Sequence, residues 1–228
     1  MAGPALPTAL AGDMNDTITA PVSAICDVLA LRSDDGCLTP TLVPIVAAPA
    51  PAIGRARTVT ITHDSTGNGM APIFDVLSDD LTGCVLVVSG AVAVPGAVWG
   101  EILTRAAQQQ GATAVLIDGW VRDRPAMATI GLPIYACGDR VAGPNGLAHV
   151  IAVGKPVLIG AVTVEPDDLI VVDGTGCVRV RAADAEAVLP AADRYAAAED
   201  LVVKALIEGE TLATAYRHKK AITDELGR

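Results

Sequence analysis

Residues 84–117 read CVLVVSGAVAVPGAVWGEILTRAAQQQGATAVLI, and this stretch decides the fold class. The segments 84–88 and 113–117 are short, apolar and rich in β-branched residues, which is typical of buried strands. Between them, residues 97–110 carry one apolar stripe at helical spacing, and Gly111 is placed to end that helix. A strand, a helix and a second strand in this order predict a right-handed crossover between parallel strands. The sequence therefore indicates an α/β fold.

The rest of the chain extends this pattern. We expect further strands and helices that are bounded by Gly, Pro or Asp. The expected strands are 56–62, 132–136, 157–164 and 169–173, and the expected helices are 19–31 and 183–216, the latter broken at Gly209. Residues 1–16 are rich in Pro, Gly and Ala and predict a flexible arm. Residues 17–228 contain no linker or repeat, so we expect a single domain with helices at its C-terminal end.

The composition limits the classes of function. The chain has 228 residues, 51% of them hydrophobic and 3% aromatic, and a formal net charge of -10. Its 16 Lys and Arg form no basic run, so we expect no nucleic-acid partner. We find no signal peptide and no apolar stretch of membrane-spanning length, and we therefore expect a cytoplasmic protein with no membrane partner. The five scattered cysteines are interpreted as small buried side chains.

Two loops carry the chemistry that the sequence offers. Residues 95–101 lead into the predicted helix and leave its first backbone N–H groups free, which favours an anion. Residues 118–123 follow the next strand and end in Arg122 and Asp123. A guanidinium suits a carboxylate, and a carboxylate oxygen suits a hard divalent cation. Because loops that follow parallel strands emerge at the same edge of a sheet, we expect these two loops to meet.

The spacing of these residues resembles a known family. Gly96-x-x-x-Gly100-Glu101, then twenty residues, then Arg122-Asp123 is similar to the signature of the RraA-like proteins, which include class II 4-hydroxy-4-methyl-2-oxoglutarate aldolases. The segments 111–123, 131–135 and 156–180 also resemble the family, and the likeness extends from about residue 18 to 210. It implies a β/β/α sandwich of the swivelling type found in phosphohistidine domains, assembled as a homotrimer or homohexamer.

The resemblance also implies an activity and a site. The activity is retro-aldol cleavage of 4-hydroxy-4-methyl-2-oxoglutarate-like substrates, or decarboxylation of oxaloacetate, through a pyruvate enolate that Mg²⁺ or Mn²⁺ stabilises. Asp123 is the direct metal ligand, Glu101 acts through water, and Glu199 of a neighbouring subunit, or Asp200 in its place, also contributes. Arg122 grips the substrate carboxylate. The turn that binds the same small acid consists of Gly96, Ala97, Val98, Trp99 and Gly100.

Several alternatives stay open. The chain could instead be a non-catalytic regulator that binds a ribonuclease, as some members of the family do. It could also be an accessory enzyme of a specialised pathway that uses the same site on a bulkier oxo acid, with Trp99 and Trp120 beside the pocket. Lys155 could form a Schiff base if it were desolvated. We interpret His63 as a loop residue and Asp173 as a turn aspartate that caps its own backbone.

Overall fold

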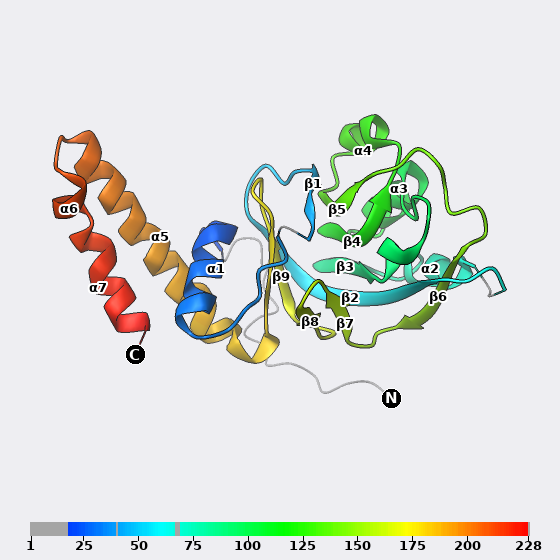
Figure 1. Cartoon of the computed structure of the whole chain (residues 1–228), viewed down its shortest axis with the longest axis horizontal. Coiled ribbons are helices and arrows are strands. Elements are labelled where there is room, and N and C mark those ends of the chain that lie inside the picture. Colours follow the sequence, from blue (N-terminus) through cyan, green and yellow to red (C-terminus); the bar gives the residue numbers. More distant parts are fainter. Residues whose placement is uncertain (1–17, 40, 67–68, 228) are drawn as a thin grey trace.

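The computed structural model describes residues 18–39, 41–66 and 69–227. An eight-stranded sheet is its largest feature, with the order β1–β5–β4–β3–β2–β9–β10 and β6 paired to β2 (Figure 1). The strands are β1 (Val43–Val46), β2 (Ala52–His63), β3 (Cys84–Ser89), β4 (Ala114–Val121), β5 (Ile134–Asp139), β6 (Ala148–Val153), β9 (Leu169–Val172) and β10 (Cys177–Val180). The predicted arm, residues 1–16, lies outside the described residues.

The predicted crossover is confirmed. Strands β3 and β4 are parallel neighbours, with Val85 opposite Ala114 and Val88 opposite Ile117. Helix α3 (Glu101–Gln109) connects them, and Gly111 follows it with φ of 82°. A side chain disfavours this left-handed conformation, which a glycine adopts freely. The α/β fold class is therefore confirmed.

Two boundaries in this region differ from the prediction. Helix α3 begins at Glu101 and not at residue 97, because Trp99 forms a parallel bridge with Val121 and the preceding residues run alongside β4. Strand β4 continues through residues 118–121, which we had expected to form a loop. Trp120 pairs with Gly138 of β5 past an irregularity in the register, so neighbouring backbone on both sides keeps this segment extended.

The shorter elements departed most from expectation. The predicted strand 157–164 is a hairpin of β7 (Val157–Ile159) and β8 (Val162–Val164), which turns at Gly160 with φ of 58°. Strands β1, β6 and β10 were not predicted, and neither were helices α2 (Ala71–Val76) and α4 (Arg124–Ile130). These segments are four to seven residues long, which is too short to show a clear hydrophobic period.

The helices near the two ends of the chain form a separate arm beside the sheet (Figure 1). The predicted N-terminal helix is α1 (Val22–Leu31). The predicted C-terminal helical region is α5 (Ala185–Ile207) and α6 (Leu212–Ala215), and the expected break is confirmed, because Gly209 has φ of 93°. A further helix, α7 (Arg217–Leu226), folds back along α5. We call α1, α5, α6 and α7 together the helical arm.

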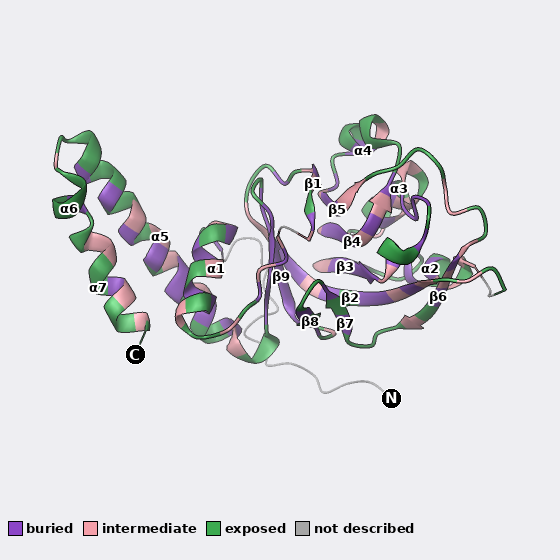
Figure 2. Cartoon of the chain, in the orientation of Figure 1, coloured by how far each residue is buried: buried purple, intermediate pink, exposed green. Residues whose placement is uncertain are grey.

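The strands of the sheet are largely buried (Figure 2), and alternate residues along them belong to different cores. One face of the sheet packs under α2, α3 and α4, through Leu86, Val88, Val115 and Ile117. Val85, Val87 and Leu116 on the opposite face pack against β7 and β8. Strand β9 divides in the same way, because Leu169 and Val171 contact α1 and α5 whereas Ile170 and Val172 join the β7–β8 core. The buried layers fix where the strands end, and thus where the two loops lie.

Two further predictions concern the cysteines and the membrane. All five cysteines are free; Cys177 is buried and the others are half-buried. Burial raises the pKa of the Cys137 thiol to about 11, so this thiol stays protonated at neutral pH. Within the described ranges, no helix has both the length and the hydropathy needed to span a bilayer.

Candidate active site

The two predicted loops meet at the carboxyl edge of β3 and β4. The Val98 amide donates a hydrogen bond to the Trp120 carbonyl at 3.0 Å, and the Arg122 amide donates one to the Trp99 carbonyl at 3.0 Å. Trp99 is buried below this contact, and its indole N–H donates to the Thr104 hydroxyl at 2.9 Å. The segment before α3 is therefore fixed to the end of β4, which confirms the predicted meeting of the loops.

Gly100 brings Arg122 and Asp123 onto the start of α3. A Cβ atom at Gly100 would lie 2.8 Å from Asp123 Oδ2 and 3.0 Å from Arg122 Cγ. Gly100 is also the N-cap residue of α3, and it offers no side chain to cap the first N–H groups. Those donors have no partner inside the helix. The absence of a side chain therefore leaves the positive end of the helix open beside both charged groups.

Arg122 and Asp123 contact each other only loosely. Arg122 Nε lies 3.6 Å from Asp123 Oδ2, and the two side chains are 45% and 48% exposed. An exposed pair of this kind contributes little to stability, so both groups are available to a ligand. Asp123 has φ of 61°, a left-handed conformation that aspartate tolerates better than most residues, and it is the residue before α4. This backbone conformation aims its carboxylate toward Gly100.

A third loop, residues 140–144, packs against residues 95–97. Arg140 donates a hydrogen bond from Nη1 to the Pro95 carbonyl at 3.0 Å, and its guanidinium lies 4.1 Å from the centre of the Trp120 ring. A Cβ atom at Gly143 would lie 3.1 Å from Arg122 Nη1, so this glycine makes room for the guanidinium. Neither Arg140 nor Gly143 was predicted from the sequence. The Gly-Pro pair at 143–144 predicts a turn in the chain, but it does not show that this turn lies beside Arg122.

Residues of the two predicted loops line a pocket of about 260 Å³. Of the predicted site residues, the pocket includes Ala97, Val98, Trp99, Gly100, Glu101, Arg122 and Asp123. Gly96 does not line it; a Cβ atom there would collide with the Gly143 carbonyl oxygen. The Ala97 amide donates to the Ala142 carbonyl at 2.8 Å, so the amides of Ala97 and Val98 are used within the fold. The free donors are instead those at the start of α3.

The oxygen atoms of this pocket suit a hard divalent cation. Asp123 and Glu101 are the carboxylates among the described residues that line it, and Glu101 is held only by Arg105, at 3.9 Å. Across the described part of the chain, no three His, Cys, Asp or Glu side chains gather as a metal cluster. Magnesium commonly takes one or two carboxylates and keeps several water ligands. The donor set therefore fits a cation that water completes.

The remaining candidate residues lie elsewhere. Glu199 is on α5, in the helical arm away from α3 and β4 (Figure 1). Its carboxylate accepts a hydrogen bond from Lys219 at 2.5 Å. Asp200 is its exposed neighbour. A single chain does not bring either residue to the pocket, and their role in a neighbouring subunit stays a prediction. Trp120 does not line the pocket, because Arg140 covers its ring, which removes one of the two tryptophans from the predicted apolar wall.

Three interpretations of single residues are settled by their surroundings. His63 is exposed, but it is the last residue of β2 and pairs with Ala148 of β6, so its interpretation as a loop residue is wrong. Lys155 is exposed in the turn before β7 and is not desolvated, which argues against Schiff-base chemistry. Asp173 Oδ1 accepts hydrogen bonds from the amide and the hydroxyl of Thr175, and its Oδ2 accepts one from the Val22 amide at 2.8 Å. Asp173 therefore caps a turn and the start of α1.

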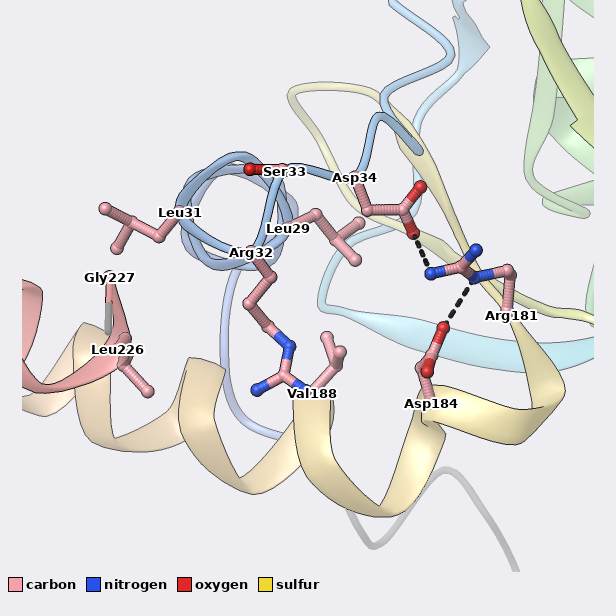
Figure 3. A pocket seen from close by; sticks show the side chains of 10 residues that line it. All are labelled: Leu29, Leu31, Arg32, Ser33, Asp34, Arg181, Asp184, Val188, Leu226 and Gly227. Carbon is pink, nitrogen blue, oxygen red and sulfur yellow. Dashed lines mark hydrogen bonds and ion pairs between the residues drawn. The ribbon is translucent and has the colours of Figure 1, made fainter.

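A larger pocket, of about 430 Å³, lies between α1, α5 and the end of α7 (Figure 3). Arg181 is the most engaged cation there: it pairs with Asp34 at 3.4 Å and with Asp184 at 2.5 Å. Leucines and Val188 form apolar walls, and Arg32 and Ser33 also line the pocket. Because Arg181, Asp34 and Asp184 satisfy one another and the predicted site residues line the smaller pocket, the sheet edge is the better candidate for chemistry.

Comparisons with known proteins identify the family of this chain. Residues 22–179 match the model of the RraA-like family, described as Aldolase/RraA. A protein of Halalkalibacterium halodurans named "Putative 4-hydroxy-4-methyl-2-oxoglutarate aldolase" is 26% identical over 205 residues, which cover 88% of this chain and 91% of that protein. A protein of Shewanella oneidensis with the same name is 30% identical over 123 residues, 54% of this chain and 71% of that protein.

Solved structures show the same fold. An uncharacterised protein of Pseudomonas syringae pv. tomato superposes with a TM-score of 0.75 at 28% identity, covering 86% of this chain and 92% of the other. Streptomyces coelicolor RraAS2, described as an unusual member of the RNase ES inhibitor RraA protein family, has a TM-score of 0.71 at 22% identity, over 87% and 98%. The expected RraA-like fold is thus confirmed, and the chain belongs to the Aldolase/RraA family.

Proposed function

We propose that this chain is a divalent-metal-dependent carbon–carbon lyase that acts on a small 2-oxo acid. One observation carries the proposal: Arg122 and Asp123 lie side by side at the uncapped start of α3, in a pocket of about 260 Å³. That volume is slightly below the range of about 300–1,000 Å³ that is usual for drug-sized ligands, and it suits a small organic acid. The names of the two relatives support the aldolase class.

Arg122 and the start of α3 bind the substrate carboxylate. The guanidinium presents parallel N–H donors that fit both oxygens of a carboxylate. Gly143 leaves space on one side of it, and Gly100 on the other. The uncapped N–H groups of α3 add positive potential to the same pocket. Substrate binding therefore orients the 2-oxo group toward Asp123.

Cleavage places negative charge on the keto oxygen. In a retro-aldol step, or in the loss of carbon dioxide, the electron pair of the broken bond moves toward that oxygen and gives the enolate of pyruvate. Magnesium or manganese bound at Asp123 would supply the Lewis acid that stabilises this charge. Glu101, on the first turn of α3, positions a water molecule that accepts and returns the proton. In a homotrimer or homohexamer, Glu199 of a neighbouring subunit would add a further carboxylate.

The test is pyruvate release from oxaloacetate and from 4-hydroxy-4-methyl-2-oxoglutarate, each measured against a reaction without enzyme. We expect release to stop after chelation with EDTA and to return with Mg²⁺ or Mn²⁺. The Asp123→Ala variant should show no metal-dependent release. Turnover that is unchanged by EDTA, or that persists in Asp123→Ala, would remove the proposed function. A chain that releases no pyruvate from any 2-oxo acid but inhibits a ribonuclease would support the regulator instead.

A further inference from the structure

The pocket holds few groups that can bind a second carboxylate. Arg122 is the one cationic side chain among the described residues that line it, beside the carboxylates of Glu101 and Asp123. Arg105, on the next turn of α3, and Arg140, which contacts the Pro95 carbonyl and the Trp120 ring, lie outside the lining of the pocket. With Arg122 and the bound cation both engaged by the 2-oxo acid end, a second substrate carboxylate would find no further basic side chain among the described residues that line the pocket.

The mouth of the same pocket is apolar. Phe74 on α2 is 57% exposed and Ile102 on the first turn of α3 is 81% exposed, although both are large hydrophobic residues. Met70 and Pro144 lie beside them around the opening. Single exposed hydrophobic residues are common on protein surfaces, but a group around one pocket indicates an apolar ligand or partner.

We infer that the physiological substrate is a 2-oxo acid with one carboxylate and an apolar substituent at the end remote from it. The inference rests on the proposed function. Arg122 takes the carboxylate, and Phe74, Ile102 and Met70 contact the substituent. Burying one methylene group contributes about 0.8 kcal/mol, which corresponds to about a fourfold change in binding.

For a 4-hydroxy-2-oxo acid with an alkyl group R on C4, the reaction balances without another reactant. The bond between C3 and C4 breaks, and its electron pair remains on C3 as the enolate. The C4 hydroxyl loses its proton and becomes the carbonyl of the aldehyde RCHO. C3 takes up a proton and becomes the methyl group of pyruvate. The same C3–C4 cleavage of 4-hydroxy-4-methyl-2-oxoglutarate gives two pyruvates, so the two reactions differ only in the group on C4.

The experiment compares matched substrates on the full-length protein with Mg²⁺. The pair is 4-hydroxy-4-methyl-2-oxoglutarate and 4-hydroxy-4-methyl-2-oxopentanoate, in which a methyl group replaces the second carboxylate. A short series of 4-hydroxy-2-oxo acids with longer alkyl ends is added. We expect a kcat/KM for the methyl analogue at least about tenfold higher, and a rise of about fourfold for each of the first methylene groups. A higher kcat/KM for the dicarboxylate would overturn the inference and leave the proposed function intact, whereas no metal-dependent release from any substrate would remove both.

Two exposed positions test the contacts. Phe74→Ala should lower kcat/KM for the long alkyl substrates about tenfold and change it little for the methyl analogue. Ile102→Lys adds a cation at the mouth, and it should shift the preference toward the dicarboxylate by at least about tenfold. Val203→Lys, on the exposed side of α5, is the matched control and should leave the preference unchanged. If Phe74→Ala changed the mass of the protein in solution but not its substrate preference, the apolar mouth would be a contact between subunits and the inference would fail.

Discussion

Charged groups at the sheet edge and in the helical arm are arranged in opposite ways. In the arm, Lys219 is only 15% exposed and reaches Glu199 at 2.5 Å and Asp27 at 3.8 Å. The Tyr195 hydroxyl also donates to Asp27, at 2.8 Å. At the sheet edge, Arg122 and Asp123 are half exposed, 3.6 Å apart, and face an open pocket. The difference indicates that the arm uses its charges to join helices, whereas the edge keeps its charges free for a ligand.

Substitution at Asp123 should give the largest effect. We expect Asp123→Ala to lower metal-dependent kcat/KM by at least about a hundredfold, because the cation loses its one direct carboxylate. Asp123→Asn is the matched control for the backbone, since asparagine also tolerates the φ of 61° at this position. Both variants should lose activity alike while Asn keeps the wild-type thermal midpoint. Full activity in the Asn variant would show that this carboxylate holds no metal.

Substitution at Arg122 should have the second-largest effect on the kinetics. Arg122→Lys keeps the charge but loses the two parallel donors, so we expect KM for the 2-oxo acid to rise about tenfold to a hundredfold. The value of kcat should fall less. Steady-state kinetics at saturating Mg²⁺ separates the two parameters. A variant with an unchanged KM would place the substrate carboxylate away from Arg122.

Gly100→Ala tests the close approach directly. The added methyl group would lie 2.8 Å from Asp123 Oδ2, so the carboxylate and the Arg122 side chain must move. We expect kcat/KM to fall about tenfold, in line with the sensitivity of catalysis to small displacements. Gly174→Ala is the control, because its nearest neighbour would be the Ala48 carbonyl oxygen at 3.9 Å. Equal kinetics for the two alanine variants would contradict the proposed contact.

Lys219→Met should have the smallest effect on activity and should act on stability instead. Burial acts to lower the pKa of Lys219, but its hydrogen bonds to Glu199 and Tyr195 outweigh burial and raise the pKa. A raised pKa in the folded state stabilises the fold below the ordinary lysine value of 10.5, and this stabilisation is lost as the pH rises further. We expect the variant to lose about 1 kcal/mol of unfolding free energy at pH 7.

Chemical denaturation at pH 7 and above pH 10.5 measures this effect: the difference between the wild type and Lys219→Met should be full at pH 7 and should shrink as the pH rises past 10.5. A constant difference across that range would show that the methionine changes packing and not an ion pair. A large fall in kcat/KM would instead show that Lys219 positions Glu199 for the site of a neighbouring subunit.

The sequence predicted the crossover and the meeting of its loops for a clear reason. Residues 84–88 of β3 and 114–117 of β4 are continuous apolar runs, and the spacing between Gly100 and Asp123 follows from one helix and one strand. The predicted end of this second strand, at residue 117, was wrong because pairing with residues 98–99 and with β5 keeps residues 118–121 extended. Local sequence does not contain those partners. Arg140 was missed for the same reason, since its contacts with Pro95 and Trp120 join segments far apart in the chain.

Binding of Mn²⁺ tests the central claim most directly, because it needs no knowledge of the substrate. Free Mn²⁺ is measured by electron paramagnetic resonance during titration of the wild type and of Asp123→Asn, with pyruvate present. We expect one saturable site per chain in the wild type and its loss in the variant, whose thermal midpoint is unchanged. Identical binding curves for the two proteins would contradict the account.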